Sequence, residues 1–248
     1  MMLTRCVLLA WLLLPLLTHA AQRIRLSLQP DDPISTTAFS IVSEAYRRLG
    51  YNPQAVLLPA ERALSSAAQG QTDADTVRAA GIEKRYPQLL PVPVVLLQVE
   101  SYAFTTGREL ALRSWEDLRP YRLCVRFGIK LLLEKTEGLD RVFSDSVPHT
   151  VQLLRAGRCD VAILSQMAWL DIDAMQAGPL RQSSVPLAVT PLYHYLHQRH
   201  RALLPKLSQV LRDMQREGRI AAIVAAQQSR VDAARARQSF ADNSSPLP

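Results

Sequence analysis

The sequence is poor in the residues from which common catalytic and metal sites are built. It has 9 glycines in 248 residues, and no glycine-rich loop of the kind that cradles phosphates occurs. Neither a Gly-x-Ser-x-Gly nor a His-Glu-x-x-His motif is present, and no cysteine and histidine cluster has zinc-ligand spacing. We therefore expect no cofactor, no metal and no catalytic residues, and an enzyme is the weakest of the alternatives.

Apolar runs long enough to cross a bilayer are absent after the first twenty residues. Arg5 precedes an apolar run over residues 6–17, and residues 18–20 (THA) supply a small-residue cleavage site. A spanning helix needs roughly 20 apolar residues, so this run is short, and an uncleaved anchor is the alternative. The sequence predicts a signal peptide over residues 1–20 and export to the periplasm.

Lysine is scarce, with 4 of the 29 basic residues, while arginine supplies the other 25. The formal net charge is +7. The arginines are scattered with few aromatic residues among them, which does not favour a nucleic-acid surface. Because the guanidinium group matches carboxylates and phosphates in bidentate fashion, we expect small anionic ligands and no nucleic-acid partner.

The first third of the mature chain alternates between strand and helix patterns. Residues 24–28 (IRLSL) and 54–58 (QAVLL) are typical of buried strands. Helical spacing over residues 35–49, with Ser35 as the expected cap and Gly50 as the stop, lies between them. This order predicts an α/β fold with a parallel sheet.

Arg78 directly follows the third predicted strand, DADTV. Ligands of open α/β sheets bind beyond the carboxyl ends of strands, where Arg78 would lie. It is therefore a candidate ligand-binding residue, and a surface ion pair is the alternative.

A helix, a Gly-x-x-Asp step and a strand occur twice, in ALSSAAQGQTDADTV and VQLLRAGRCDVAIL. Between them, residues 89–106 read as a strand leaving the first half, since Pro91 and Pro93 oppose a helix. Residues 184–196 are expected to lead back. The repeat predicts two similar lobes.

Three histidines recur at intervals of three in HYLHQRH, namely His194, His197 and His200. The segment before them resembles a strand, and side chains alternate between the two faces of a strand. We therefore expect ordinary surface or core histidines here, not a metal site.

Three segments together resemble the extracellular solute-binding protein family 3, the amino-acid type of periplasmic binding proteins. They are CVRFGIKLLLEKTEG, LRAGRCDVAIL and LYHYLHQRHRALLPKLSQVLRDMQREGRIAAIV. The resemblance implies a two-lobed type II periplasmic binding fold with two crossing hinge strands, lobe 1 over residues 21–103 and 193–248, and lobe 2 over residues 104–192. The tail after about residue 240 is expected to be disordered.

By this resemblance, lobe 1 offers an arginine to a ligand carboxylate, and Arg78 is preferred over Arg85. In lobe 2, Arg126, Gly128 and Lys130 would form a cationic turn against the ligand.

The resemblance also places Tyr102 and Phe104 on the floor of the site, with hinge packing as the alternative role. The aspartate that would hold an ammonium group is replaced by Ser165, which puts a plain α-amino acid in doubt. The family's proline-aromatic loop after the first strand is missing as well.

The lobe architecture would make the strands of Cys124 and Cys159 parallel neighbours. A disulfide between them and two buried thiols are both compatible with this arrangement.

The sequence thus predicts a monomeric periplasmic binding protein that captures a small polar, anionic or amino-acid-like metabolite for the permease of an ABC-type transporter. The alternative is a sensory protein of the same fold that signals to a membrane receptor.

Overall fold

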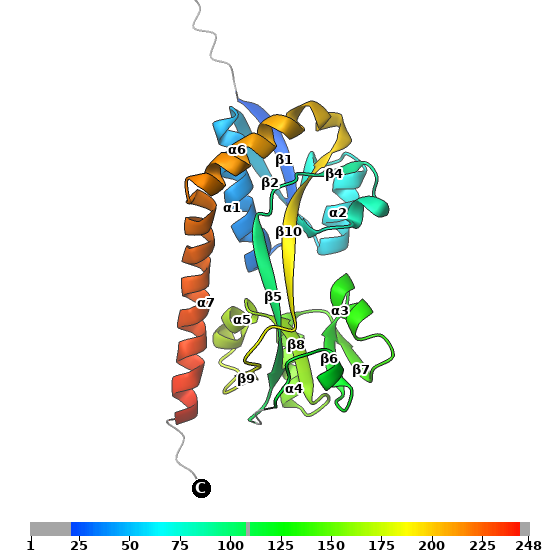
Figure 1. The fold of residues 1–248 in the computed structure, drawn as a ribbon, viewed down its shortest axis with the longest axis vertical. Coiled ribbons are helices and arrows are strands. Elements are labelled where there is room, and N and C mark those ends of the chain that lie inside the picture. The colour runs from blue at the N-terminus through cyan, green and yellow to red at the C-terminus, as the bar shows by residue number, and fades with distance from the viewer. Residues whose placement is uncertain (1–20, 108–109, 244–248) are drawn as a thin grey trace, which may run out of the picture.

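The computed structural model describes residues 21–107 and 110–243. The predicted signal peptide and the last part of the predicted tail, residues 244–248, lie outside the described residues. The structure has two lobes joined by long strands (Figure 1).

Lobe 1 contains a parallel sheet covered by helices. Its elements are β1 (Gln22–Leu28), α1 (Pro33–Arg48), β2 (Tyr51–Leu57), α2 (Ala60–Ala68), β3 (Ala74–Ala79), β4 (Leu89–Pro91) and α6 (Leu204–Arg216), with 3-10 turns at Ile82–Lys84 and Gln198–Leu203. The strands 24–28, 54–58 and DADTV and the helix 35–49 predicted from the sequence are confirmed, with small shifts at their ends.

Helix α1 begins at Pro33, two residues before its predicted start at Ser35. Asp32 is the N-cap. Its Oδ2 accepts two hydrogen bonds from Ser35, one from the backbone N–H at 2.9 Å and one from the Ser35 hydroxyl at 2.6 Å. Pro33 follows as the first helical residue, a position where its missing N–H costs nothing. The expectation that Ser35 caps the helix is wrong, because the Asp-Pro pair before it provides the stronger start.

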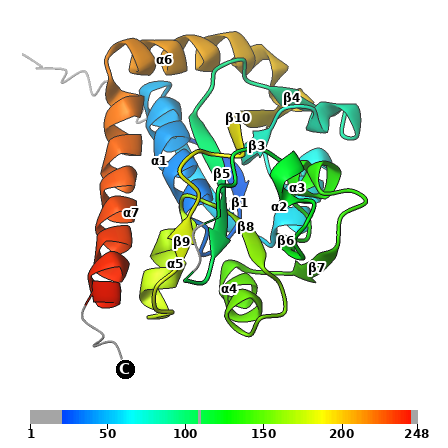
Figure 2. The same cartoon turned by 60° about the horizontal axis from the view of Figure 1, so that its bottom comes forward.

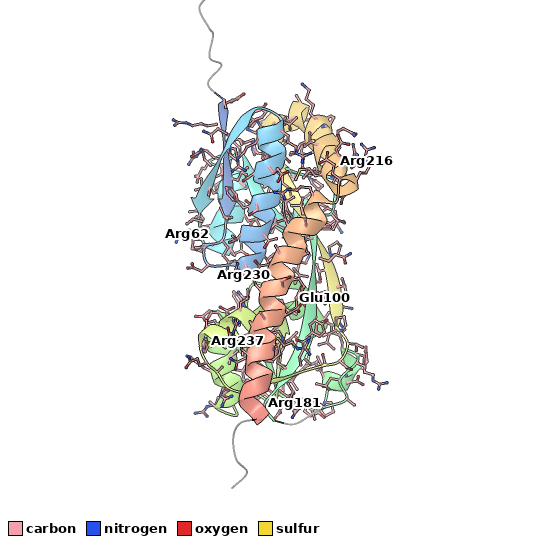
Figure 3. The ribbon with its side chains drawn as sticks, turned by 90° about the vertical axis from the view of Figure 1, so that its left-hand side faces the viewer. Arg62, Glu100, Arg181, Arg216, Arg230 and Arg237 are labelled. Atoms are coloured by element: carbon pink, nitrogen blue, oxygen red, sulfur yellow. A yellow bond between two sulfur atoms is a disulfide. The ribbon has the colours of Figure 1, made fainter. Side chains whose placement is uncertain are left out.

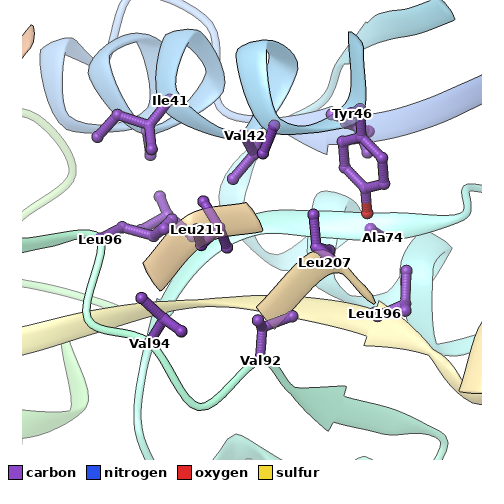
Figure 4. Packing of buried hydrophobic residues seen from close by; sticks show 14 of the residues in the cluster. Ile41, Val42, Tyr46, Ala74, Val92, Val94, Leu96, Leu196, Leu207 and Leu211 are labelled. Atoms are coloured by element: carbon purple, nitrogen blue, oxygen red, sulfur yellow. The ribbon is translucent and has the colours of Figure 1, made fainter. Parts of the chain in front are cut away.

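The apolar face of α1 forms the core of lobe 1. Ile41 and Val42 are fully buried and face residues of α6 and of the segment after β4 (Figure 4). Labelled partners in that view include Val92, Val94, Leu96, Leu207 and Leu211. The spacing of the apolar residues along α1 therefore decides which side of the helix meets the sheet.

Lobe 2 repeats the arrangement on a smaller scale. Its elements are β6 (Leu123–Arg126), α3 (Lys130–Lys135), β7 (Arg141–Ser144), α4 (Val147–Arg155), β8 (Val161–Ser165), α5 (Ala168–Ala174) and β9 (Arg181–Gln182), with a 3-10 turn at Glu116–Leu118. Strands β6 and β8 are parallel neighbours, and Cys124 and Cys159 form a disulfide with Cα atoms 5.6 Å apart. The disulfide alternative is the one that the structure shows.

Two antiparallel strands cross between the lobes, β5 (Leu97–Thr105) and β10 (Ala188–His197). They place the lobes on one continuous sheet with the strand order β2-β1-β3-β10-β5-β8-β6-β7. The boundaries expected near residues 103 and 193 fall inside these crossing strands.

The C-terminal helix α7 (Arg219–Asn243) differs from the expected organisation. Residues 193–248 were assigned to lobe 1 with a disordered tail after about residue 240, whereas α7 continues to Asn243 and packs on both α1 of lobe 1 and α5 of lobe 2. Two views show this helix alongside both lobes (Figures 1 and 2). Within the described residues, no helix has the length and apolar content of a membrane span.

His194 is completely buried in lobe 1, between α1 and β3. Its Nδ1 lies 3.1 Å from the Thr76 carbonyl, which can only accept, so Nδ1 carries the proton and Nε2 accepts from the Tyr46 hydroxyl at 2.8 Å. Burial lowers the pKa of His194 to about 4. Among the described residues, no group of three or more His, Cys, Asp or Glu side chains is placed to hold a metal ion.

Candidate functional site

The carboxyl ends of the parallel strands of both lobes point toward each other. Ala79 at the end of β3 pairs with Leu192, which pairs with Leu97 of β5. Ser101 of β5 pairs with Ser165 at the end of β8. Leu97 and Ser101 are about 13 Å apart along an extended strand, so this distance separates the two sets of strand ends. The strand ends are thus spaced for a small molecule between the lobes.

Arg126 ends strand β6 at this position. Its Nε atom is buried and has no hydrogen-bond partner among the described residues. A buried donor without a partner costs free energy, so a ligand that accepts from it gains a larger advantage than at an exposed site. Arg126 therefore has the environment of a binding residue.

The Asp171 carboxyl of α5 lies within electrostatic reach of the Arg126 guanidinium and of the Asp32 carboxylate of lobe 1. Burial raises the pKa of the half-buried Asp171 carboxyl, the Arg126 guanidinium opposes this shift, and the Asp32 carboxylate adds to it. In the described part of the chain, neither Arg126 nor Asp171 forms a salt bridge within 4.0 Å. Asp171 thus experiences the field of a cation from its own lobe and of an anion from lobe 1.

The turn after β6 has the shape that the sequence predicts. Gly128 has φ +84°, in the left-handed region that favours glycine, and a Cβ added there would meet open space. Lys130 is the first residue of α3 and is exposed, with its Nζ 3.6 Å from Glu134 Oε1. Gly128 thus allows the tight turn, and the exposed Lys130 side chain pairs with Glu134 of its own helix.

Arg78 lies at the end of β3 but is engaged inside lobe 1. Its Nε and Nη2 are each 3.0 Å from Asp75 Oδ2, and Nη2 also donates to the Ala60 carbonyl at 2.7 Å. Asp75 is buried, which raises its pKa, and Arg78 opposes that shift. The alternative considered for Arg78, an ion pair, is present, and a ligand contact by this residue stays a prediction. Arg85 is exposed and lies over the Tyr86 ring, 5.3 Å from its centroid.

The two aromatic candidates on β5 differ in their surroundings. Tyr102 is half-buried and donates to Glu100 Oε2 at 2.6 Å, and burial together with this bond raises its pKa to about 12. Phe104 is fully buried, with its ring centroid 5.3 Å from that of Trp169. Phe104 therefore packs in the core of lobe 2 and offers no surface to a ligand in this structure.

Ser165 is half-buried at the end of β8, opposite Ser101. The next residue, Gln166, accepts from the Glu100 N–H at 2.9 Å through its side-chain Oε1. This bond ties the end of β8 to the crossing strand and places Ser165 at the edge between the lobes.

Sequence reasoning did not select Asp171 or Asp32 as site residues. Asp171 interrupts the apolar face of AWLDIDA, which was a visible signal in the sequence. Asp32 is the N-cap of α1, in place of the expected Ser35, and its proximity to Asp171 depends on how the lobes meet.

Comparison with protein-family models finds no match, and neither does comparison with curated proteins. Solved structures do match. A histidine kinase sensor domain with similarity to periplasmic binding proteins is 20% identical with a TM-score of 0.69, covering 84% of this chain and 96% of that one. ArgBP from T. maritima, as its P235GK mutant, is 18% identical with a TM-score of 0.68, covering 84% and 95%.

A third similar structure is the probable amino-acid ABC transporter extracellular-binding protein ytmK from Bacillus subtilis. It is 14% identical with a TM-score of 0.68 and covers 82% of this chain and 96% of that one. The chain therefore has the type II periplasmic binding protein fold, and the predicted fold class is confirmed.

Proposed function

We propose that this protein binds a small amino-acid-like or acidic metabolite between its lobes. The observation that carries the proposal is the buried, unpartnered Nε of Arg126, together with the half-buried Asp171, which lies within electrostatic reach of both Arg126 and Asp32 across the lobe boundary. A guanidinium without a protein partner favours a carboxylate or phosphate, and two nearby carboxylates favour a cationic group on the same molecule.

Ligand binding would work through differential affinity for lobe arrangements. A molecule that contacts Arg126 and Asp171 of lobe 2 and Asp32 of lobe 1 stabilises the arrangement in which all three are in reach. Lys130 and Ser165, at the same edge of lobe 2, complete the proposed contact set. Tyr102 borders it on the crossing strand.

Two biological uses of this binding are open to the fold. The similarity to an ABC transporter binding protein supports delivery to an inner-membrane permease after export to the periplasm. The similarity to a histidine kinase sensor domain supports the alternative, in which the bound state informs a membrane receptor. Neighbouring genes distinguish them, since a permease and an ATPase favour transport and a kinase favours signalling.

A thermal-shift screen of the mature chain tests the proposal. The screen uses amino acids, dicarboxylates, polyamines and phosphorylated compounds, together with the N-acetyl and methyl-ester forms of each amino acid. A ligand at a concentration of 100 times its Kd raises the free energy of unfolding by about 2.7 kcal/mol. For a chain of this size, this raises the Tm by roughly 5 to 10 °C. We expect this rise from molecules that carry a carboxylate.

Blocking the carboxylate should abolish the shift, because Arg126 then has no anion to bind. Blocking the amine of a zwitterionic ligand should reduce it through Asp171. Stabilisation by polyamines with none by acids would contradict the proposal. Recovery of a chemically altered ligand after incubation would instead indicate an enzyme.

A further inference from the structure

Helix α7 is anchored in the core of lobe 1 through its first turns. Ile220 is buried there, and Ile223 and Val224 pack against the same cluster. Arg219 Nε donates to Glu44 Oε2 of α1 at 2.8 Å. Both apolar and charged contacts therefore hold the start of α7 on lobe 1.

The second half of the same helix is anchored in lobe 2. Val231 and Ala234 are buried in the cluster that contains Trp169 and Ile172 of α5. Arg237 binds Asp173 of α5 through Nη2 to Oδ2 at 2.6 Å and Nε to both carboxylate oxygens at 3.0 and 3.1 Å.

These two anchors lie far apart on one continuous helix. Ile220 and Ala234 are about 21 Å apart along the axis at 1.5 Å per residue. Figure 3 shows α7 passing from the lower part of lobe 1 down along lobe 2, with Arg230 and Arg237 labelled. The crossing strands β5 and β10 form the other two connections between the lobes.

An intact helix neither stretches nor shortens, because its length is fixed by the i to i−4 hydrogen bonds. A hinge rotation about β5 and β10 changes the distance between points on the two lobes that lie off the hinge. The lobes can thus rotate only if α7 leaves one of its anchors or slides on it.

We propose that α7 is a strut that sets the angle between the lobes, and that its anchor on α5 must yield before the lobes can rotate. The first turn of α1 supports the same junction, since Ile34 packs against both the lobe 1 core and the cluster containing Val231 and Ala234. The crossing strands alone would leave the angle free, and α7 removes that freedom.

Interlobe distances measured by pulsed electron spin resonance test this proposal without any ligand. Spin labels are placed on Lys206→Cys of α6 and Gln152→Cys of α4, two exposed positions, one on each lobe. Cys124 and Cys159 are held in the disulfide, and the chain used begins after residue 20, so that Cys6 of the predicted signal peptide takes no label. Ala234→Asp puts a charge into the buried anchor, and Ala233→Asp places the same residue on the exposed side of the helix.

We expect a narrow distance distribution in the parent chain and in the Ala233→Asp control, and a distribution at least about twice as wide in Ala234→Asp. A milder variant, Arg237→Glu, introduces charge repulsion with Asp173 without altering the core. It should also widen the interlobe distance distribution. The charge swap Asp173→Arg with Arg237→Glu should restore the narrow distribution.

Equal widths in all these variants would overturn the proposal, because the crossing strands would then fix the angle by themselves. Hydrogen exchange on the same samples separates release of α7 from unfolding of lobe 2. If α7 is released while lobe 2 stays folded, the amides of β6 and β8 remain protected and those after Val231 lose protection. A narrow interlobe distance distribution in a variant with this exchange pattern would also overturn the proposal.

Discussion

Replacing Arg78 with alanine is expected to lower the free energy of unfolding by about 3 kcal/mol near pH 7.5, the lower end for breaking a buried ion pair. Asp75 is only 1% exposed. Among the described residues, Arg78 is the only charged partner of its carboxylate. The low end applies because the Arg78 side chain is 23% exposed and solvent screens part of the interaction.

The size of this loss depends on pH in a defined direction. Burial raises the pKa of Asp75 in the folded state, and loss of Arg78 raises it further. At low pH the folded protein can bind a proton at Asp75 and avoid the buried charge. The destabilisation of Arg78→Ala should therefore be small near pH 4 and grow as pH rises, as measured by urea unfolding.

A second substitution at the partner provides the control for this effect. Asp75→Asn in the Arg78→Ala background removes the unpaired charge and should recover most of the lost stability. Arg122→Ala breaks an exposed pair with Asp140, for which we expect a loss of less than about 1 kcal/mol. An Arg78→Ala chain as stable as Arg122→Ala at pH 7.5 would contradict the structural role.

Lowering the pH from 6.5 to 4 is expected to reduce the free energy of unfolding by about 3 kcal/mol through His194 alone. Each unit of pKa shift corresponds to about 1.36 kcal/mol. Burial lowers the pKa of this imidazole from 6.5 to about 4 in the folded state. Between these values the unfolded chain binds a proton at His194 and the folded chain does not. The stability is thus fully present above pH 6.5 and is lost as pH falls toward 4.

Comparison of the parent chain with His194→Gln isolates this contribution, since every other titrating group is common to both. The glutamine variant should be less stable at pH 7.5, because Tyr46 and Thr76 lose their partner. Its stability should also fall less steeply between pH 6.5 and 4.5. If the free energy of unfolding changed with pH in the same way in both chains, His194 would not be the neutral, buried group described above.

Most of the fold could be predicted from the sequence because local patterns and lobe architecture agree. The helix, Gly-x-x-Asp and strand unit occurs once in each lobe, and both copies became α/β units with strands β3 and β8. The path of α7 could not be predicted. Its apolar residues are divided between two cores, so no single periodic face marks which lobe it will meet.

The site was less predictable than the fold. Arg126 and Gly128 could be proposed as site residues from the turn after a strand, because their placement is local. Asp171 and Asp32 could not, since Asp171 comes within electrostatic reach of Asp32 only through the packing of the two lobes. Arg78 has the position of a ligand-binding residue, but the sequence did not indicate that Asp75 on its own strand would engage it.

The most direct test of the central claim is a calorimetric titration of the best ligand from the screen into Arg126→Ala and Arg122→Ala. Both substitutions remove a guanidinium from β6 or its entry, but only Arg126 lies at the carboxyl end that faces lobe 1. We predict that Kd rises at least about tenfold in Arg126→Ala, with its Tm without ligand unchanged, and stays within about twofold in Arg122→Ala. Equal Kd values for the two variants would contradict binding between the lobes at Arg126.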